Sequence, residues 1–358
     1  MTFTDILLII GAFVLILFGA EVFTDGVEWL GIKLNLSQGA TGSILAAIGT
    51  ATPETLIPVI AILFTNSADS DEIGVGAILG APFMLATLVM LLIGVTAFVL
   101  RGRRGRTTLH VDAAHATRDL SFFLVMYTIA LALALLPAQL HFLKGYIGWI
   151  FLPTYFLYLY LVLRTPRRTA ADVEEAVEER EAFEDLTFAK YLQRLGSRVV
   201  PTDPPLWLVL TQTLVSFGAI VLGARFFADF VEDFSHAMNF DTLLVALILA
   251  PLATELPEAA NSLIWTKDGK DVIALGNVAG AMVFQSTIPV SLGVLLTPWQ
   301  LGQFGTVAAV FALVSGAIIW IQLRTRTKDN ALPLTALMAG GSLYVVFIAY
   351  VLWSVLAT

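Results

Sequence analysis

Two glutamates, each directly preceded by a proline, are the residues of this sequence best suited to chemistry. Glu54 and Glu258 lie inside long apolar stretches, one in each half of the chain. An ionised side chain at the centre of a bilayer costs roughly 2.5–3.5 kcal/mol, so two such groups require a compensating partner. No Lys or Arg stands beside either glutamate within its apolar stretch. The pair therefore predicts a site for a cation or for protons.

The prolines add oxygen ligands to this predicted site. Proline has no backbone N–H, so the carbonyl four residues earlier lacks its helical donor, and in both halves a threonine follows that carbonyl. Carboxylates, carbonyls and hydroxyls together suit Ca²⁺, Na⁺ or Mg²⁺ and not a soft metal. The alternative is a pair of kinked helices whose glutamates are protonated and structural. The candidate ligands are Gly49, Thr50 and Glu54 in the first half and Ala253, Thr254 and Glu258 in the second.

Glu255 is a third carboxylate, three residues before Glu258 and on nearly the same helical face. The first half has Ala51 at the equivalent position. Because close carboxylates resist double ionisation, we expect protons to compete with a divalent cation for this cluster. The alternative is that Glu255 lines an aqueous access route. Asn277 and Gln285 are two further polar candidates for the same site.

The elements that must position these residues are membrane-spanning helices. Of the 358 residues, 58% are hydrophobic and 13% are charged, whereas a typical soluble domain has about 25% charged residues. Runs of about 20 apolar residues are typical of membrane spans, so the composition excludes a soluble enzyme and a nucleic-acid-binding protein. We expect an all-α polytopic membrane protein. Its ten predicted helices cover residues 5–31, 38–64, 73–100, 119–137, 143–164, 205–235, 241–265, 271–296, 303–323 and 332–356.

An internal repeat divides these helices into two sets of five. Residues 19–28 align with residues 223–232, and the two Pro-Glu pairs align at the same offset. Because five is odd, the second set enters the membrane from the opposite side, which is the inverted repeat typical of secondary transporters. The predicted division is residues 1–164, an acidic linker at 165–204, and residues 205–358. The duplicated core segments are at about 38–100 and 241–296.

The basic residues predict how the chain is oriented. With ten spans, 18 of the 20 Lys and Arg residues fall in connections or helix ends on one side of the membrane. Basic residues in short loops mark the cytoplasmic side. We therefore expect the basic loops and the acidic linker in the cytoplasm, both termini outside, and the protein in the cell membrane.

The motifs around the two glutamates resemble the two α-repeats of the Ca²⁺/cation antiporter superfamily, and most of all its sodium/calcium exchangers. The matching stretches are residues 49–54 with 76–81 and residues 253–258 with 276–281. This resemblance implies ten helices in two inverted fives. It also implies that Glu54 and Glu258 coordinate Ca²⁺, with Thr50 and Thr254 at matching ligand positions.

Several positions depart from the family pattern. The family serine is Ala51 in one repeat and Glu255 in the other, and the second family asparagine is Pro82 and Met282. Only Asn277 keeps the asparagine of the Gly-Asn motif. The divalent-ion centre is therefore expected to be retained, whereas the sodium ligands are depleted.

The sequence thus predicts a secondary active antiporter that exchanges a divalent cation, above all Ca²⁺, for Na⁺ or H⁺ by alternating access. It is expected to be no enzyme and to need no cofactor, and its partners are the lipid bilayer and small inorganic cations. Two alternatives are a proton-coupled exchanger of another divalent cation and a cation-binding membrane scaffold or sensor without transport.

Overall fold

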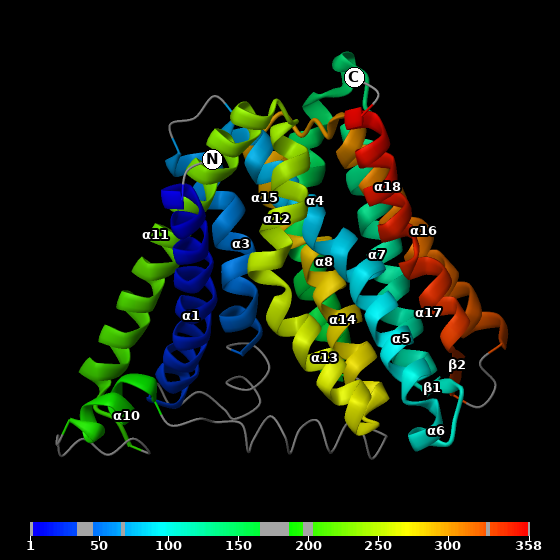
Figure 1. Ribbon diagram of the computed structural model, residues 1–358, viewed down its shortest axis with the longest axis horizontal. Helices are drawn as coiled ribbons and strands as arrows, with labels where there is room; N and C mark the ends of the chain where they lie inside the picture. Colours follow the sequence, from blue (N-terminus) through cyan, green and yellow to red (C-terminus); the bar gives the residue numbers. More distant parts are fainter. Residues whose placement is uncertain are drawn as a thin grey trace. The chain divides into compact units, whose positions relative to one another are not determined.

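The computed structural model describes residues 3–33, 46–65, 69–164, 186–195, 203–326 and 330–356. The described chain is helical throughout, apart from two three-residue strands that pair as an antiparallel ribbon (Figure 1). Eight of its helical stretches are long and apolar enough to cross a membrane, and the bent α12–α13 pair is a ninth candidate span. The protein is an all-α polytopic membrane protein, as the apolar runs predict.

The described residues group into two compact units. The first unit comprises residues 1–67 and 166–238. Its helices are α1 (Phe3–Lys33), α3 (Ala46–Phe64), α10 (Thr187–Arg194) and α11 (Leu206–Met238).

The second unit comprises residues 68–165 and 239–358. Its elements are α4 (Ser70–Met84), the π-helical turn η2 (Leu85–Val89), α5 (Met90–Val99), α6 (Arg101–Arg104), β1 (Thr108–His110), α7 (Ala113–Ala134), η3 (Ala138–Leu140), α8 (Phe142–Arg164), α12 (Thr242–Thr254), α13 (Leu256–Asp268), α14 (Asp271–Gln285), α15 (Ile288–Leu296), α16 (Gly302–Arg326), β2 (Ala331–Pro333), α17 (Leu334–Gly341) and α18 (Leu343–Leu356).

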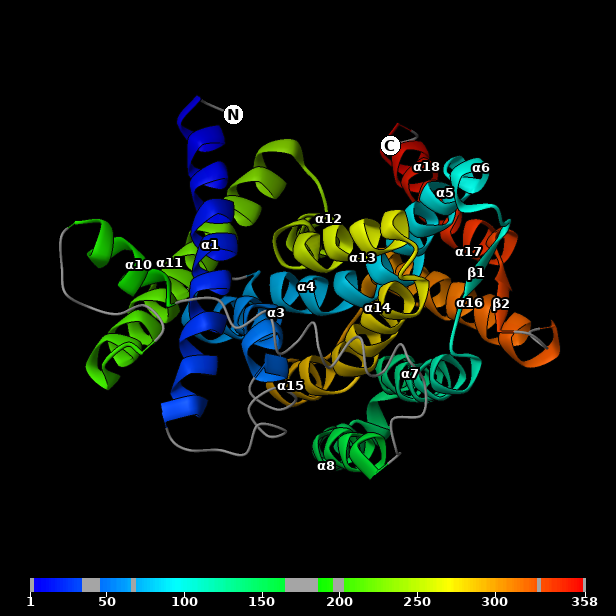
Figure 2. The ribbon, with the colours of Figure 1, turned by 90° about the horizontal axis from the view of Figure 1, so that it is seen from below.

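Glycines allow α1 and α11 to pack closely along each other in the first unit (Figure 2). A methyl group on Gly26 would lie 2.5 Å from the Thr213 hydroxyl, and one on Gly223 would lie 2.9 Å from the Ile16 side chain. Helix α3 packs against both, and its Leu56 lies against the buried cluster of Phe23, Val27 and Ile220. Close approach of backbones through small residues is typical of helix association in membranes.

Glycines also allow close packing where α4 crosses α12 in the second unit. A methyl group on Gly76 would lie 2.5 Å from the Leu243 carbonyl oxygen, and one on Gly80 would overlap the carbonyl oxygen of Leu247. Both glycines belong to the Gly-xxx-Gly motif that the sequence places after the first Pro-Glu pair. The motif therefore fixes the distance between α4 and α12.

The helix boundaries differ from the prediction at several places. The predicted helices 271–296 and 332–356 are each divided in two, as α14 with α15 and α17 with α18. Helix α7 begins at Ala113 and not at residue 119, because the Asp112 side chain accepts hydrogen bonds from the backbone N–H groups of Ala114 and His115. Arg118, counted as a loop residue in the charge pattern, therefore lies inside α7. The predicted single helix 241–265 is divided into α12 and α13, which are bent by 55°.

Other predicted segments fall partly outside the described residues. For the predicted span 38–64, the structure describes α3 from Ala46 onward, and residues 38–45 lie outside the description. Of the predicted linker 165–204, it describes residues 186–195, which contain α10, and residues 203–204.

The two compact units cut across the two predicted repeats. The first unit takes α1 and α3 from the first half and α11 from the second, and the remaining spans form the second unit. A unit defined by packing thus differs from a unit defined by duplication. The repeat boundaries at 164 and 205 stay a prediction from the sequence.

Candidate functional site

A break between α12 and α13 places two carboxylates at one point of the second unit. Helix α12 ends at Thr254, Glu255 joins the two helices, and α13 begins at Leu256 with Pro257 as its second residue. Pro257 has no N–H for the Ala253 carbonyl, so the regular hydrogen-bond ladder cannot continue through this point. The sequence predicts a missing helical hydrogen bond here within one helix, and the structure shows a complete break.

The Glu255 carboxylate is held by hydrogen bonds from α12 and α14. Its side chain is fully buried, with 0% exposure. One oxygen accepts a hydrogen bond of 2.9 Å from the Thr254 hydroxyl, and the other accepts one of 2.7 Å from the Gln285 amide at the end of α14. Gln285, a candidate from the sequence, therefore reaches the carboxylate cluster through Glu255.

The Glu258 carboxylate lies in the first turn of α13 and is satisfied less well. Its Oε2 atom is buried and receives no hydrogen bond from the described part of the chain. A carboxylate oxygen of Glu258 lies within 4.8 Å of one of Glu255. Two acidic groups this close in an apolar setting repel each other when both are ionised. A cation bound between the two carboxylates, or protonation of one of them, would remove this repulsion.

Asn277 on α14 is hydrogen-bonded to α13, the helix that bears Glu258. Its side-chain amide donates to the main-chain carbonyl of Glu258 at 3.3 Å and to the Ser262 hydroxyl at 3.1 Å. Ser262 is fully buried on α13. The Asn277 amide thus fastens the first turns of α13 to α14. Sequence reasoning missed Ser262; its spacing of four residues from Glu258 was the available signal.

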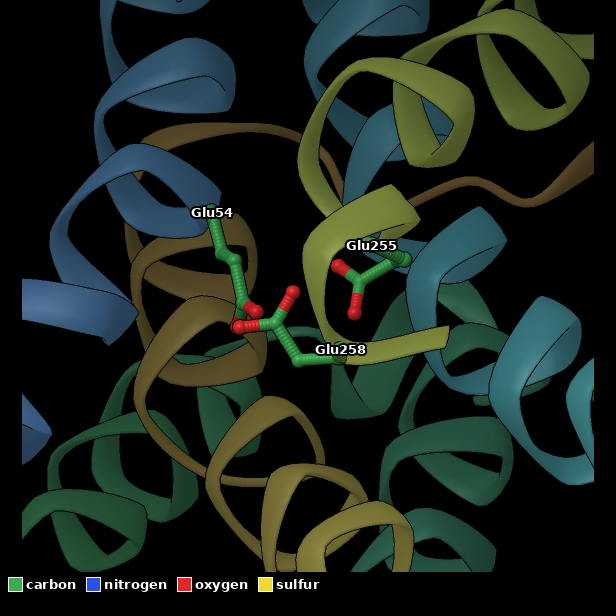
Figure 3. Close-up of side chains that lie close together, drawn as sticks. All are labelled: Glu54, Glu255 and Glu258. Carbon is green, nitrogen blue, oxygen red and sulfur yellow. The ribbon is translucent and has the colours of Figure 1, made fainter. Parts of the chain in front are cut away.

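The first-half candidates lie on α3 of the other unit. Glu54 is buried, with 8% exposure, and Figure 3 draws it on α3, with Glu255 and Glu258 drawn at the α12–α13 break. Gly49 and Thr50 belong to the first turns of α3, ahead of the part of that helix whose side chains are described. The Thr50 hydroxyl therefore lies outside the description, whereas the Gly49 carbonyl belongs to the described main chain of α3.

Two residues that depart from the family motif, Pro82 and Met282, lie in helices of the second unit. Pro82 lies inside α4, one turn before the π-helical turn η2. Met282 on α14 is fully buried in the apolar core. Neither side chain offers an oxygen ligand.

Comparison with known proteins identifies the family. A family model described as sodium/calcium exchanger protein matches residues 4–164 and 208–356. Among curated proteins, the inner membrane protein YrbG of Escherichia coli (strain K12) is 22% identical over 352 residues, which cover 97% of this chain and 96% of that protein. CaxA of Alkalimonas amylolytica, which is named as an antiporter, is 25% identical over 292 residues, covering 80% of this chain and 78% of that protein.

Two solved structures share the fold at low identity. The H⁺/Ca²⁺ exchanger CAX superposes with a TM-score of 0.65 and 12% identity, covering 96% of this chain and 82% of its own. The sodium-calcium exchanger NCX_Mj superposes with a TM-score of 0.54 and 16% identity, covering 98% of this chain and 99% of its own. The chain therefore belongs to the sodium/calcium exchanger protein family, whose members are integral-membrane cation antiporters and not enzymes.

Proposed function

We propose that this antiporter exchanges a divalent cation, above all Ca²⁺, for Na⁺ or H⁺. The observation that carries the proposal is the pair at the α12–α13 break. Glu258 has a buried oxygen without a donor among the described residues, and a second carboxylate lies within 4.8 Å. A buried acceptor without a partner costs about 1–3 kcal/mol, and more if it is charged. A bound divalent cation would remove that cost and the repulsion together.

The internal repeat supplies the rest of the proposed ion site. Glu54 occupies the position in the first repeat that Glu258 occupies in the second, and it is also buried. The proposed ligands are these two carboxylates, the hydroxyls of Thr50 and Thr254, and the carbonyls of Gly49 and Ala253. Glu255 and the polar pair Asn277 and Gln285 are proposed as its surroundings in the second repeat.

Glu255 favours a role for protons in coupling. It stands where the family has a serine, and its two oxygens are occupied by Thr254 and Gln285. Fewer neutral oxygens are then left to bind Na⁺, while the additional negative charge beside Glu258 favours protonation of the pair. A proton-coupled exchanger of another divalent cation remains the nearest alternative within transport.

Alternating access is proposed to involve α1 and α11. These two long helices pack along each other through glycines in one compact unit. They are proposed to slide across the helices that bear the Pro-Glu motifs. The basic loops are proposed to face the cytoplasm, with both termini outside and the protein in the cell membrane.

Ion flux into proteoliposomes tests the proposal. The wild-type chain should accumulate radioactive Ca²⁺ when a Na⁺ or H⁺ gradient is imposed, and Glu258→Gln and Glu54→Gln should each reduce that flux to background. Asp268→Asn is the matched control, because Asp268 lies at the exposed end of the same helix as Glu258. Near wild-type flux in either glutamine variant would refute the assignment of the site.

The same preparation separates a transporter from a scaffold or sensor. A scaffold binds Ca²⁺ but shows no accumulation driven by a gradient. Replacing Ca²⁺ by Mg²⁺ or Mn²⁺ in the flux measurement identifies the divalent cation that is carried.

A further inference from the structure

The only described helix of the acidic linker, α10, is fastened to two membrane spans of the first unit. The Thr187 hydroxyl donates to the Asp25 carboxylate of α1 at 2.6 Å. The backbone N–H of Phe188 donates to the side-chain oxygen of Gln212 on α11 at 2.8 Å. Gln212 is fully buried, and its amide donates to the Val22 carbonyl of α1 at 3.0 Å. One glutamine therefore connects α1, α10 and α11.

One side of α10 packs through apolar residues against the ends of α1 and α11. Leu186 and Ala189 are fully buried against Trp29 of α1 and against Leu208 and Val209 of α11. Trp29 is one turn from the end of α1 at Lys33, and Leu208 is in the first turn of α11. Figure 1 shows α10 beside these ends. The helix therefore lies at the level where both spans leave the membrane.

The outward side of α10 has one basic edge and one apolar edge. Lys190 and Arg194 are four residues apart and therefore neighbours on the helix surface, and so are Tyr191 and Leu195. Tyr191 is 52% exposed and Leu195 is 84% exposed. The guanidinium of Arg194 lies 5.9 Å from the centre of the Tyr191 ring.

The apolar edge has a counterpart at the start of α11. Leu206 is 46% exposed and Trp207 is 60% exposed. Aromatic residues at the ends of membrane spans are typical of the lipid headgroup region. Basic residues next to exposed aromatic and aliphatic ones are typical of helices that lie in the surface of an anionic membrane. Lys190 and Arg194 supply the complementary charge for such a surface.

We propose that α10 and the first turn of α11 form a binding surface for the headgroups of anionic phospholipids. Leu195, Tyr191 and Trp207 enter the boundary between headgroups and acyl chains, while Lys190 and Arg194 contact phosphate groups. Because α10 is hydrogen-bonded to both α1 and α11, lipid bound here holds the linker against this pair of spans. The surface is independent of the proposed cation site, since none of its residues is a proposed ligand.

Fluorescence quenching in vesicles tests the proposal with the full-length chain. The sequence contains no cysteine, so Leu195→Cys accepts a single environment-sensitive fluorophore. The labelled protein is reconstituted in phosphatidylcholine with increasing fractions of phosphatidylglycerol and with a quencher attached to the lipid chains. Quenching should increase with phosphatidylglycerol. Adding Lys190→Gln or Arg194→Gln should raise the phosphatidylglycerol fraction needed for half-maximal quenching about fivefold. Each basic residue near an anionic surface contributes about 1 kcal/mol, which corresponds to about a fivefold change in binding.

Matched controls separate this surface from general charge effects. Lys267→Gln with Lys270→Gln removes two basic residues, one from the last turn of α13 and one from the α13–α14 connection, and should leave the quenching at residue 195 unchanged. Added salt should weaken the effect of phosphatidylglycerol in the wild-type background, which provides a test even if a glutamine variant fails to fold.

Two results would overturn the proposal. One is equal quenching in neutral and anionic vesicles. The other is unchanged quenching at residue 195 in anionic vesicles when Lys190 and Arg194 are both changed to Gln. That second result would show that the basic edge of α10 does not bind lipid phosphate.

Discussion

At the scale of single residues, the two carboxylates of the α12–α13 break are unequal. Glu255 is fully buried and has a hydrogen-bond donor at each oxygen, whereas Glu258 has a buried oxygen without a donor among the described residues. Donors that hold a carboxylate in place also fix the position of its charge. We therefore interpret Glu255 as a fixed neighbour of the ion site and Glu258 as a ligand.

Changing Glu255 to serine tests this interpretation. Glu255→Ser removes one of the two close carboxylates and restores the residue of the family motif. We expect Ca²⁺ flux to depend less steeply on pH and to respond more strongly to Na⁺, because fewer protons compete and one more neutral oxygen is present. The measurement is flux in proteoliposomes over a pH series, with and without a Na⁺ gradient. Identical profiles for both proteins would assign Glu255 to the access route only.

Asp112 gives a residue-scale prediction about stability outside the membrane spans. Partial burial alone would raise the pKa of this carboxyl, but hydrogen bonds from the His115 main chain and imidazole and from the Ala114 N–H lower it below its usual range. A lowered pKa in the folded state stabilises the protein above the unfolded-state pKa. That contribution is lost as the pH falls through the folded-state pKa.

The variant Asp112→Ala should therefore be less stable than wild type by about 1 kcal/mol at neutral pH, the usual value of a helix N-cap. The difference in melting temperature should vanish in acid, well below pH 4, where the wild-type carboxylate is protonated. Thermal unfolding of both proteins in detergent measures this. A difference that persists unchanged in acid would contradict the assignment of the cap.

At the scale of elements, backbone geometry decides how close the helices come. The crossing of α4 with α12 depends on Gly76 and Gly80, where the partner is a main-chain oxygen that cannot rotate away. Helix α12 leads directly into the break that bears Glu255 and Glu258, so a change in this crossing also displaces the carboxylates.

We expect Gly80→Ala to destabilise the protein by about 1–3 kcal/mol, the usual cost of forcing extra volume into packed helices, and to reduce flux. Gly218→Ala is the control, because no described atom lies within 4 Å of a methyl group at that position of α11. Alanine is also the better helix former, so Gly218→Ala should be neutral or slightly stabilising. Melting temperature and flux check both variants, and equal effects at the two positions would contradict the packing argument.

At the scale of the whole molecule, the charge pattern and the ten predicted spans determine the expected orientation. The Cys-free chain permits a direct test with single cysteines. Gly102→Cys and Ala171→Cys should react with a membrane-impermeant thiol reagent only from the cytoplasm, and Gln139→Cys, in the exposed connection between α7 and α8, only from outside. Labelling of residue 102 from outside would reverse the orientation.

The sequence by itself determined the membrane class, the helical segments and the cation-antiporter family. These properties follow from local features: long apolar runs, the energetic cost of a carboxylate within them, and a motif repeated in both halves. The energetic cost of a carboxylate in an apolar run and the spacing of apolar residues follow from the sequence alone. Neither depends on how the helices contact each other. The same features predicted a distortion at Pro257, because the missing N–H is a local property.

Only the tertiary structure decided which polar groups meet. Gln285 donates to Glu255 across thirty residues of sequence, whereas Asn277 donates to the Glu258 main chain and to Ser262. The sequence presented both as equal candidates, because their reach depends on the rotation of α14 against α13. The docking of α10 through Gln212 and the grouping of α1 and α3 with α11 have the same cause. Packing between distant segments is set by side-chain fit at the contact, which no local pattern records.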